Sequence, residues 1–208
     1  MAKIEALYDA VLSGKRNDVI TIVEEAVDAK VDVAEILMGS MIPAMAEIGD
    51  RFSRNEAYVP EMLISARAMQ AGLDILDPLL QAAGHEPIGK VAVGTVKGDL
   101  HDIGKNLVGM MLKGAGFEVI DLGVDCDVEK YREAAEQGAK VLLLSALLTT
   151  TMPYMKEVVE GLKTSDAKIL IGGAPVTQAY ADEIGADGYS DDANTAVNAA
   201  KIALGISA

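Results

Sequence analysis

The spacing of hydrophobic residues divides the chain into two halves. Up to about residue 82, apolar side chains recur every three to four positions without the alternation of a strand, which predicts a four-helix bundle. From Lys90 onward, short apolar runs rich in β-branched residues alternate with amphipathic stretches. The pattern therefore predicts an all-α region followed by an α/β region.

The α/β half is expected to contain five strands and five helices. The expected strands are 90–96, 117–121, 140–146, 168–172 and a short one near 187–189. The expected helices lie near 103–115, 127–137, 151–164, 176–185 and 191–204. The central runs are continuously apolar, as in strands buried on both faces of a parallel sheet. With right-handed crossovers, these elements predict a five-stranded, doubly wound parallel sheet of the flavodoxin or Rossmann type.

A segment with glycine and proline separates the two halves. Residues 84–89 show no apolar period and combine two glycines with a proline, as in a linker. We therefore predict a helical cap at 1–83 and an α/β domain at 90–208, joined by this linker. Within the cap, Pro43 is expected to kink or interrupt the third helix. His85 is expected to be a solvated linker residue.

Composition and charge narrow the class of protein. The 208 residues are half hydrophobic and carry a formal net charge of −14. A chain this acidic repels phosphate backbones, so nucleic acid is not an expected partner, and no basic cluster suggests a membrane surface. Without an apolar signal segment or a membrane-length apolar run, we expect a cytoplasmic protein. The single Cys126, expected in a loop after a strand, is read as an incidental thiol and excludes an internal disulfide.

The residues that could bind a ligand or a metal lie in three loops, each of which follows an expected strand. Residues 98–104 read Gly-Asp-Leu-His-Asp-Ile-Gly, residues 145–151 are rich in hydroxyls, and residues 172–175 begin with two glycines. Because the carboxyl ends of parallel strands meet at one edge, these loops are expected to lie together where open α/β sheets bind ligands. Asp99 can reach the far ring nitrogen of His101, an arrangement that orients a metal-ligating histidine.

Other interpretations of these residues fit less well. The stretch before Asn106 resembles a P-loop superficially, but Asn106 stands where Ser or Thr is required and the glycine spacing is wrong. A zinc site requires three or four ligands, and one histidine is available here. Ser145, His101 and Asp99 offer the groups of a hydrolytic triad, but Ser145 lacks the Gly-x-Ser-x-Gly turn. One histidine held by a carboxylate, beside hydroxyls and glycines, suits a large cofactor that brings its own metal.

On these motifs the chain resembles the corrinoid-binding proteins of B12-dependent methyl transfer. The family pattern is Asp-x-His-x-x-Gly, then Ser-x-Leu, then Gly-Gly. The matching residues are Asp99, His101 and Gly104, then Ser145 and Leu147, then Gly172 and Gly173. The family also carries an N-terminal four-helix cap, so the resemblance covers nearly the whole chain and implies a B12-binding α/β domain.

The resemblance implies a role for each matched residue of the α/β half. His101 is implied to replace the cofactor's own base as the lower axial cobalt ligand, the base-off, His-on state. Asp99 and Thr151 are implied to continue a proton relay from His101. Ser145 and Thr149 are implied to contact the buried base, and Gly172 and Gly173 to line the cofactor's tail. The remaining implied cofactor contacts are Gly98, Asp102, Ile103, Gly104 and Leu147.

Two residues of the cap match side chains that cover the upper face of the cofactor in the family. They are Phe52 and Val59, with Tyr58 in the same segment. Their implied role is to shield the methyl-bearing cobalt from water and light. The alternative is that Phe52 and Tyr58 are ordinary core of the bundle.

The resemblance implies a methyl carrier rather than a complete enzyme. The carrier would hold cobalamin or a related corrinoid and accept a methyl group on Co(I) from a methyltransferase for methylamines, methanol or methoxyaromatics. A second methyltransferase would pass it to tetrahydrofolate or coenzyme M, and a reductive activator is a further implied partner. The alternatives are a B12-sensing regulator, against which the acidity argues, and a cofactor-free response module, in which His101 makes little sense.

Overall fold

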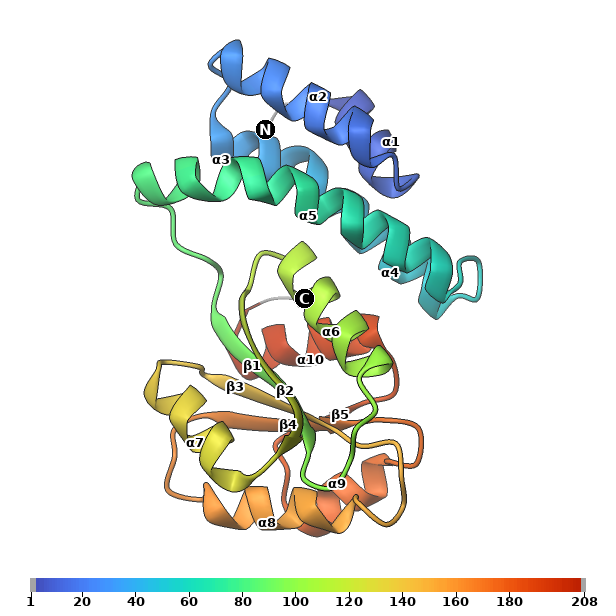
Figure 1. Ribbon diagram of the computed structural model, residues 1–208, viewed down its shortest axis with the longest axis vertical. Coiled ribbons are helices and arrows are strands. Elements are labelled where there is room, and N and C mark those ends of the chain that lie inside the picture. The colour runs from blue at the N-terminus through green and yellow to red at the C-terminus, as the bar shows by residue number, and fades with distance from the viewer. Residues whose placement is uncertain (1–2, 207–208) are drawn as a thin grey trace. The chain divides into compact units, whose positions relative to one another are not determined.

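The computed structural model describes residues 3–206 of the chain. They form two compact units. One ends at Pro87 and includes Lys113–Gly116, and the other comprises Ile88–Leu112 and the chain from Phe117 onward. Figure 1 draws the helical unit in blue to blue-green and the α/β unit in green to red. No helix in the described part of the chain is long and apolar enough to cross a membrane.

The helical unit is a bundle in which the third expected helix is divided. Its elements are α1 (Glu5–Leu12), α2 (Arg16–Asp28), α3 (Val33–Ile36), a π-helical turn η1 (Leu37–Met41), α4 (Ile42–Ser53) and α5 (Val59–Ala82). Asp32 caps α3, because its carboxylate accepts hydrogen bonds from the N–H groups of Ala34 and Glu35, each at 3.0 Å. The apolar faces of α1, α2, α4 and α5 supply the buried core.

Pro43 explains the division of the third helix. Proline has no N–H group, and in a regular helix its ring collides with the carbonyl four residues earlier. In η1 the N–H of Ile42 bonds to the carbonyl of Leu37, five residues back, so the turn is widened. Pro43 then occupies the first turn of α4, where no N–H is required. The expected interruption therefore takes the form of a π-helical turn.

The second unit is the expected five-stranded parallel sheet with helices on both faces. The strands are β1 (Lys90–Val96), β2 (Glu118–Cys126), β3 (Val141–Ser145), β4 (Lys168–Gly172) and β5 (Gly188–Ser190), in the order β2-β1-β3-β4-β5. The helices are α6 (Ile103–Gly114), α7 (Val128–Glu136), α8 (Pro153–Gly161), α9 (Gln178–Ile184) and α10 (Ala193–Ala203). In Figure 1, α6 and α10 cover one face, and α7, α8 and α9 cover the other. The predicted fold class is confirmed.

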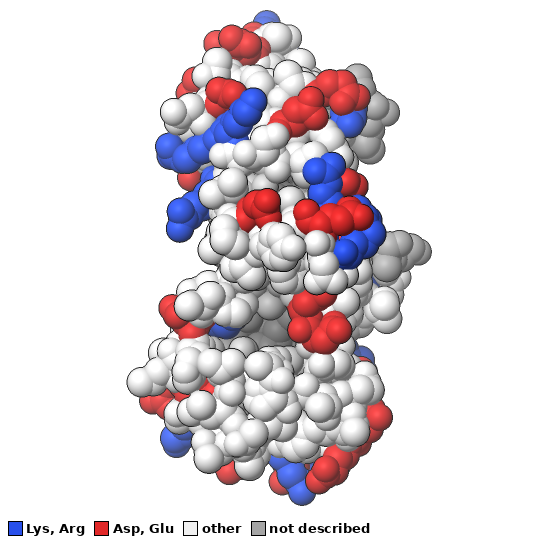
Figure 2. Space-filling model, turned by 90° about the vertical axis from the view of Figure 1, so that its right-hand side faces the viewer, with Lys and Arg blue, Asp and Glu red and all other residues white. Residues whose placement is uncertain are grey.

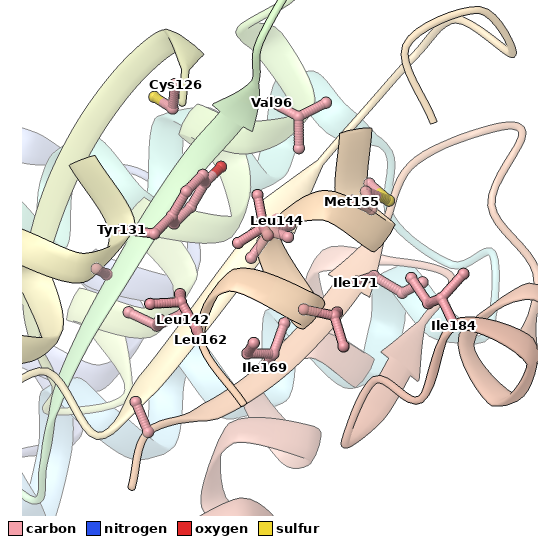
Figure 3. Close-up of a cluster of buried hydrophobic side chains, with 14 of the residues drawn as sticks. Val96, Cys126, Tyr131, Leu142, Leu144, Met155, Leu162, Ile169, Ile171 and Ile184 are labelled. Carbon is pink, nitrogen blue, oxygen red and sulfur yellow. The ribbon is translucent and has the colours of Figure 1, made fainter. Parts of the chain in front are cut away.

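Large buried side chains pack between the sheet and helices α7 to α9 (Figure 3). Leu142 and Leu144 of β3 face this layer because alternate residues of a strand point to the same side. Tyr131 of α7 is fully buried, and its hydroxyl has no hydrogen-bond partner among the described residues. Burial raises the pKa of Tyr131 well above its ordinary value. A Cβ atom on Gly94 would lie 2.9 Å from this hydroxyl, so Gly94 leaves room for it.

Strand β2 is longer than the sequence predicted. The expected strand at 117–121 continues to Cys126, so the expectation that Cys126 lies in a loop was wrong. The register against β1 shifts twice between residues 93 and 96, which places two bulges in β2. Gly123 and Asp125 have positive φ angles of 78° and 51°. Residues with positive φ angles commonly mark a turn, but here β2 stays paired with β1 as far as Cys126.

Candidate functional site

The loops after β1 and β3 flank the point at which the sheet reverses its winding direction. β1 and β3 are neighbours, and the chain continues from β1 to one edge of the sheet and from β3 to the other. Open α/β sheets bind ligands outside the carboxyl ends of their strands at such a point. The strands in Figure 1 run toward the right-hand side, and Figure 2 views that side. The lower part of that view, which is the α/β unit, presents a broad area without charged side chains.

The Asp99 carboxylate is the buried centre of the site. Its Oδ1 atom accepts the His101 N–H at 3.0 Å and lies 2.6 Å from His101 Nδ1. Its Oδ2 atom accepts the N–H groups of Leu147 and Leu148 at 2.8 and 3.3 Å and the Thr151 hydroxyl at 2.8 Å. Burial raises the pKa of Asp99, but these hydrogen bonds outweigh it and hold the pKa well below its ordinary value. Asp99 is therefore an ionised carboxylate that joins the first two loops.

The His101 imidazole is held through its Nδ1 atom, while the side chain remains half exposed. Because Asp99 is ionised, Nδ1 carries the proton that it donates to this carboxylate, so Nε2 is the ring nitrogen left to ligate a metal. The backbone is also held, since the carbonyl of His101 accepts the hydroxyl of the buried Thr95 at 2.8 Å. The His101 side chain is 50% exposed. The arrangement presents a nitrogen suited to metal ligation.

The second loop supplies one buried hydroxyl and several accessible ones. Thr151 is buried, and its Oγ1 atom lies 2.8 Å from Asp99 Oδ2 and 2.9 Å from the carbonyl oxygen of Leu148. Its single proton can serve only one of these acceptors at a time. Ser145 is half-buried at the end of β3, and Thr149 is exposed. Thr151 is thus the one of the three hydroxyls that contacts Asp99 directly.

Close packing within the protein explains why the third loop has two glycines. A Cβ atom on Gly173, whose φ is +122°, would lie 1.9 Å from the carbonyl oxygen of Ala146. A Cβ atom on Gly172 would lie 2.8 Å from the carbonyl oxygen of Ser190. Gly104 differs, because an added Cβ there would meet nothing within 4 Å. Of these three glycines, Gly104 is the one without a packing reason on the protein side.

Exposed apolar side chains lie in the His101 loop and in the second loop, which Asp99 joins to it. The first two loops carry four of them, and their exposed fractions are large: Leu100 71%, Ile103 73%, Leu147 45% and Leu148 42%. Asp102 is exposed beside them and accepts a hydrogen bond from the Asn106 side chain at 3.0 Å. Apolar side chains grouped on a surface commonly mark a binding site. One imidazole nitrogen within an apolar rim fits a broad cofactor that supplies its own metal.

The expected covering residues belong to the helical unit. Phe52 lies near the end of α4 and is half-buried. Val59, the first residue of α5, is 36% exposed, and the preceding Tyr58 is 64% exposed. Tyr58 is therefore not part of the bundle core. The backbone between them turns through Asn55, which has a positive φ of 61°.

The sequence interpretation missed charged residues that hold the His101 loop. Lys105 is 3% exposed, and its Nζ atom lies 2.5 Å from Asp121 Oδ1. Asp125 Oδ1 accepts the N–H of Gly98 at 2.8 Å. These partners lie 16 and 27 residues apart in the chain. No local sequence pattern indicates these contacts, because each one joins β2 to a distant part of the chain, either the His101 loop or the start of α6.

Known relatives share both units of this chain. Two models of the B12 binding domain match residues 89–198 and 3–77. The chain is 39% identical to a corrinoid protein of Desulfitobacterium hafniense, with 99% of each chain covered. It is 40% identical to dimethylamine corrinoid protein 1 of Methanosarcina acetivorans, with 95% of each covered. It matches a chain of the methanol:cobalamin methyltransferase complex MtaBC from Methanosarcina barkeri with a TM-score of 0.84 at 29% identity, covering 97% of this chain and 80% of that one. The chain therefore belongs to the family of B12-binding corrinoid proteins found in methyltransferase systems.

Proposed function

We propose that this protein is a methyl carrier that serves two methyltransferases in turn, with His101 as the lower ligand of a base-off corrinoid. The observation that carries this proposal is the half-exposed imidazole of His101, whose Nδ1 atom is held by the buried carboxylate of Asp99. A corrinoid would bring its own metal and most of its ligands, so one nitrogen from His101 would be enough to hold it. When bound, the corrinoid supplies the cobalt ion that takes up and releases the methyl group.

Asp99 and Thr151 determine the environment of the proton on His101 Nδ1. Asp99 keeps the Nδ1 atom protonated and makes the Nε2 atom a stronger donor, as carboxylate partners do for metal-ligating histidines. The Thr151 hydroxyl proton can point to Asp99 or to the carbonyl of Leu148. When it points to Asp99, it reduces the negative charge that His101 experiences. The chain can therefore adjust the basicity of His101 through a buried hydroxyl.

The residues around His101 bind the ring and exclude water. The exposed side chains of Leu100, Ile103, Leu147 and Leu148 offer an apolar bed, and Gly98 and Gly104 add no side chain to it. Asp102, which is exposed in the same loop, is proposed to border this bed. The hydroxyls of Ser145 and Thr149 are proposed to contact the base, with Gly172 and Gly173 along the tail. Phe52 and Val59 of the helical unit are proposed to cover the opposite face of the ring.

The proposed donors are small methylated compounds. The relatives include a dimethylamine corrinoid protein and a chain of a methanol:cobalamin methyltransferase complex, which favours methylamines or methanol beside the methoxyaromatic compounds that the resemblance also implied. The same relatives favour a carrier over a B12-sensing regulator. The proposed acceptors are tetrahydrofolate or coenzyme M, each with its own methyltransferase, and a reductive activator completes the system.

The proposal is tested by loading and methylating the protein. We expect the chain to retain one hydroxocobalamin after free cofactor is removed. After reduction, one donor-specific methyltransferase with its methylamine, methanol or methoxyaromatic substrate should convert the visible spectrum to that of the methylated form. A methyltransferase for tetrahydrofolate or coenzyme M should then reverse the change. Retention of the cofactor without methyl transfer in any donor or acceptor pairing would contradict the carrier role.

A further inference from the structure

The bulged end of β2 lies beside the His101 loop, and its residues belong to none of the three motifs. Its two aspartates, Asp121 and Asp125, bond to opposite ends of that loop. We infer that these two aspartates are positioning residues that fix the direction of the His101 Nε2 atom. The consequence for cobalt ligation rests on the proposed function, whereas the positioning itself is a property of the protein alone.

Asp125 clamps the start of the loop. Its Oδ1 atom accepts the N–H of Gly98 at 2.8 Å, and its own N–H donates to the carbonyl of Asp99 at 3.1 Å. These two bonds hold the backbone on both sides of the Gly98–Asp99 peptide. Because Asp99 carries the carboxylate that orients the imidazole, a shift of this peptide is transmitted directly to His101.

The backbone of Asp125 adopts a strained conformation that allows its two hydrogen bonds to the loop. Its φ of 51° lies in the left-handed region, which costs free energy for a residue with a side chain. Asp and Asn adopt this region more readily than most residues. Strained residues of this kind persist where the surrounding structure requires them, commonly at functional sites. Here the strained conformation turns both the N–H and the carboxylate of Asp125 toward the loop.

Asp121 clamps the end of the loop through Lys105. Lys105 follows Gly104 in the first turn of α6, and its ammonium group is buried against Asp121 at 2.5 Å. The same Oδ1 atom accepts the N–H of Gly123 at 2.9 Å. A buried ammonium group is costly without its partner, so the pair ties the start of α6 to the first bulge. The loop between Gly98 and Lys105 is thereby held at both ends by one strand.

The bulges explain how one strand reaches both ends. Val93 of β1 pairs with Asp121, the next residue pairs with Gly123, and Val96 pairs with Cys126. β2 therefore inserts an extra residue at each step relative to β1. Extra residues in a strand re-aim the side chains beside them. Asp121 and Asp125 lie at these two irregularities and bond from there to the two ends of the loop.

The test compares variants at Asp125 in the cofactor-free protein. Asp125→Gly removes the carboxylate and also relieves the left-handed backbone, whereas Asp125→Asn keeps an oxygen acceptor. Lys30→Gly is the matched control, because Lys30 has a similar φ of 59° but lies in the helical unit. The readout is ¹⁵N-resolved NMR of the two histidine rings, with His85→Gln used to assign His101.

We expect the wild type, Asp125→Asn and Lys30→Gly to share an Nδ1-protonated His101 whose ring proton exchanges slowly with solvent. In Asp125→Gly that exchange should accelerate by roughly tenfold or more, the factor expected for loss of one hydrogen bond to a charged group. The Nε2-protonated form should also appear. Asp121→Ala should change the His101 signals in the same direction, and Asp121→Asn, which keeps an oxygen acceptor for Lys105 but not the charge, should change them less.

An unchanged His101 spectrum in both Asp125→Gly and Asp121→Ala overturns the inference, and an unchanged spectrum in one overturns it for that end of the loop. In the loaded protein, Asp125→Gly should retain corrinoid but show reduced histidine-nitrogen coupling in the Co(II) EPR spectrum. If the wild type binds no corrinoid, the proposed function fails, and the NMR comparison still decides the positioning role.

Discussion

Asp99 brings together the backbone and side-chain groups that define the protonation state of the site. Two N–H groups of the second loop, one N–H of its own loop, an imidazole and a hydroxyl all converge on one carboxylate. Each of them favours the ionised form, and together they overcome the cost of burial. The same bonds that fix the imidazole therefore also join two of the three loops.

The depressed pKa of Asp99 predicts a specific dependence of stability on pH. Its folded pKa lies below the unfolded value of about 3.9, so its contribution is present above that value and is lost as the pH falls toward the folded pKa. Asp99→Asn should lower the free energy of unfolding at pH 7 by about 2 kcal/mol. The difference from wild type should shrink between about pH 5 and pH 3. Urea unfolding measured across this range, with the exposed Asp166→Asn as control, tests this, and a constant difference would contradict it.

Gly104 offers a test that separates folding from cofactor binding. An added methyl group there meets no protein atom within 4 Å, and the position lies in the first turn of α6. Gly104→Ala should leave the free energy of unfolding unchanged or raise it by up to about 1 kcal/mol, because alanine favours a helix. Retention of hydroxocobalamin should nevertheless fall. Thermal unfolding and gel filtration of the loaded variant provide the two measurements, and undiminished retention would remove Gly104 from the proposed contacts.

At the scale of the residue, the sequence was informative where partners are neighbours. Asp99 and His101 lie two positions apart, so their pairing follows from the loop that they share. Lys105 and Asp125 carried no such signal, because each partner comes from a different element. The glycine pair was recognised, but its main constraint is the carbonyl groups of Ala146 and Ser190. Contacts that depend on tertiary packing cannot be read from local spacing.

At the scale of the element, hydrophobic periodicity predicted the order and type of the helices and strands of the α/β unit. It succeeded because burial on both faces of β3 and β4 leaves continuous apolar runs. It failed at the end of β2, where Gly123 and Asp125 have the local signature of a turn. The strand continues there only because β1 pairs with it. Hydrophobic periodicity also gives no sign of the π-helical turn η1, which accommodates Pro43 at the start of α4.

Tyr131 predicts an unusual effect of removing a hydroxyl from the core. Its buried oxygen has no hydrogen-bond partner in the described structure, so Tyr131→Phe removes a desolvated group and no bond. The free energy of unfolding should stay constant or rise by up to about 1 kcal/mol. Tyr180→Phe is the matched control, because the Tyr180 hydroxyl donates to the carbonyl of Met152 at 2.8 Å. It should lose about 1 kcal/mol, and an equal loss in Tyr131→Phe would show that its hydroxyl is satisfied.

At the scale of the whole molecule, two units are joined by a short exposed segment. α5 ends at Ala82 in a turn closed by Gly84, whose φ is +74°, and by the N–H of His85 on the carbonyl of Leu80. The residues from 83 to 87 are exposed. His85 lies among them, as the sequence predicted for a solvated residue. A cut in this segment would break no helix or strand of either unit.

Limited proteolysis should locate this connection. We expect brief treatment with proteinase K to cleave first between residues 83 and 87, because this segment is exposed and ends at Pro87 without regular structure. The turn at 54–58 is also largely exposed, but the carbonyl of Arg51 accepts two backbone N–H groups there. It should be cut more slowly. Mass spectrometry of the first fragments decides, and a first cut at 54–58 would contradict the expectation.

The central claim is that His101 ligates the cobalt of a bound corrinoid, and EPR of the Co(II) form tests it most directly. The wild type, loaded with hydroxocobalamin and reduced to Co(II), should show hyperfine coupling to a nitrogen that becomes a ¹⁵N pattern when the histidines are ¹⁵N-labelled. His101→Ala should remain folded and lose this coupling, whereas His85→Ala should keep it. A wild-type spectrum insensitive to histidine labelling, or unchanged in His101→Ala, would contradict the assignment of His101 as the ligand.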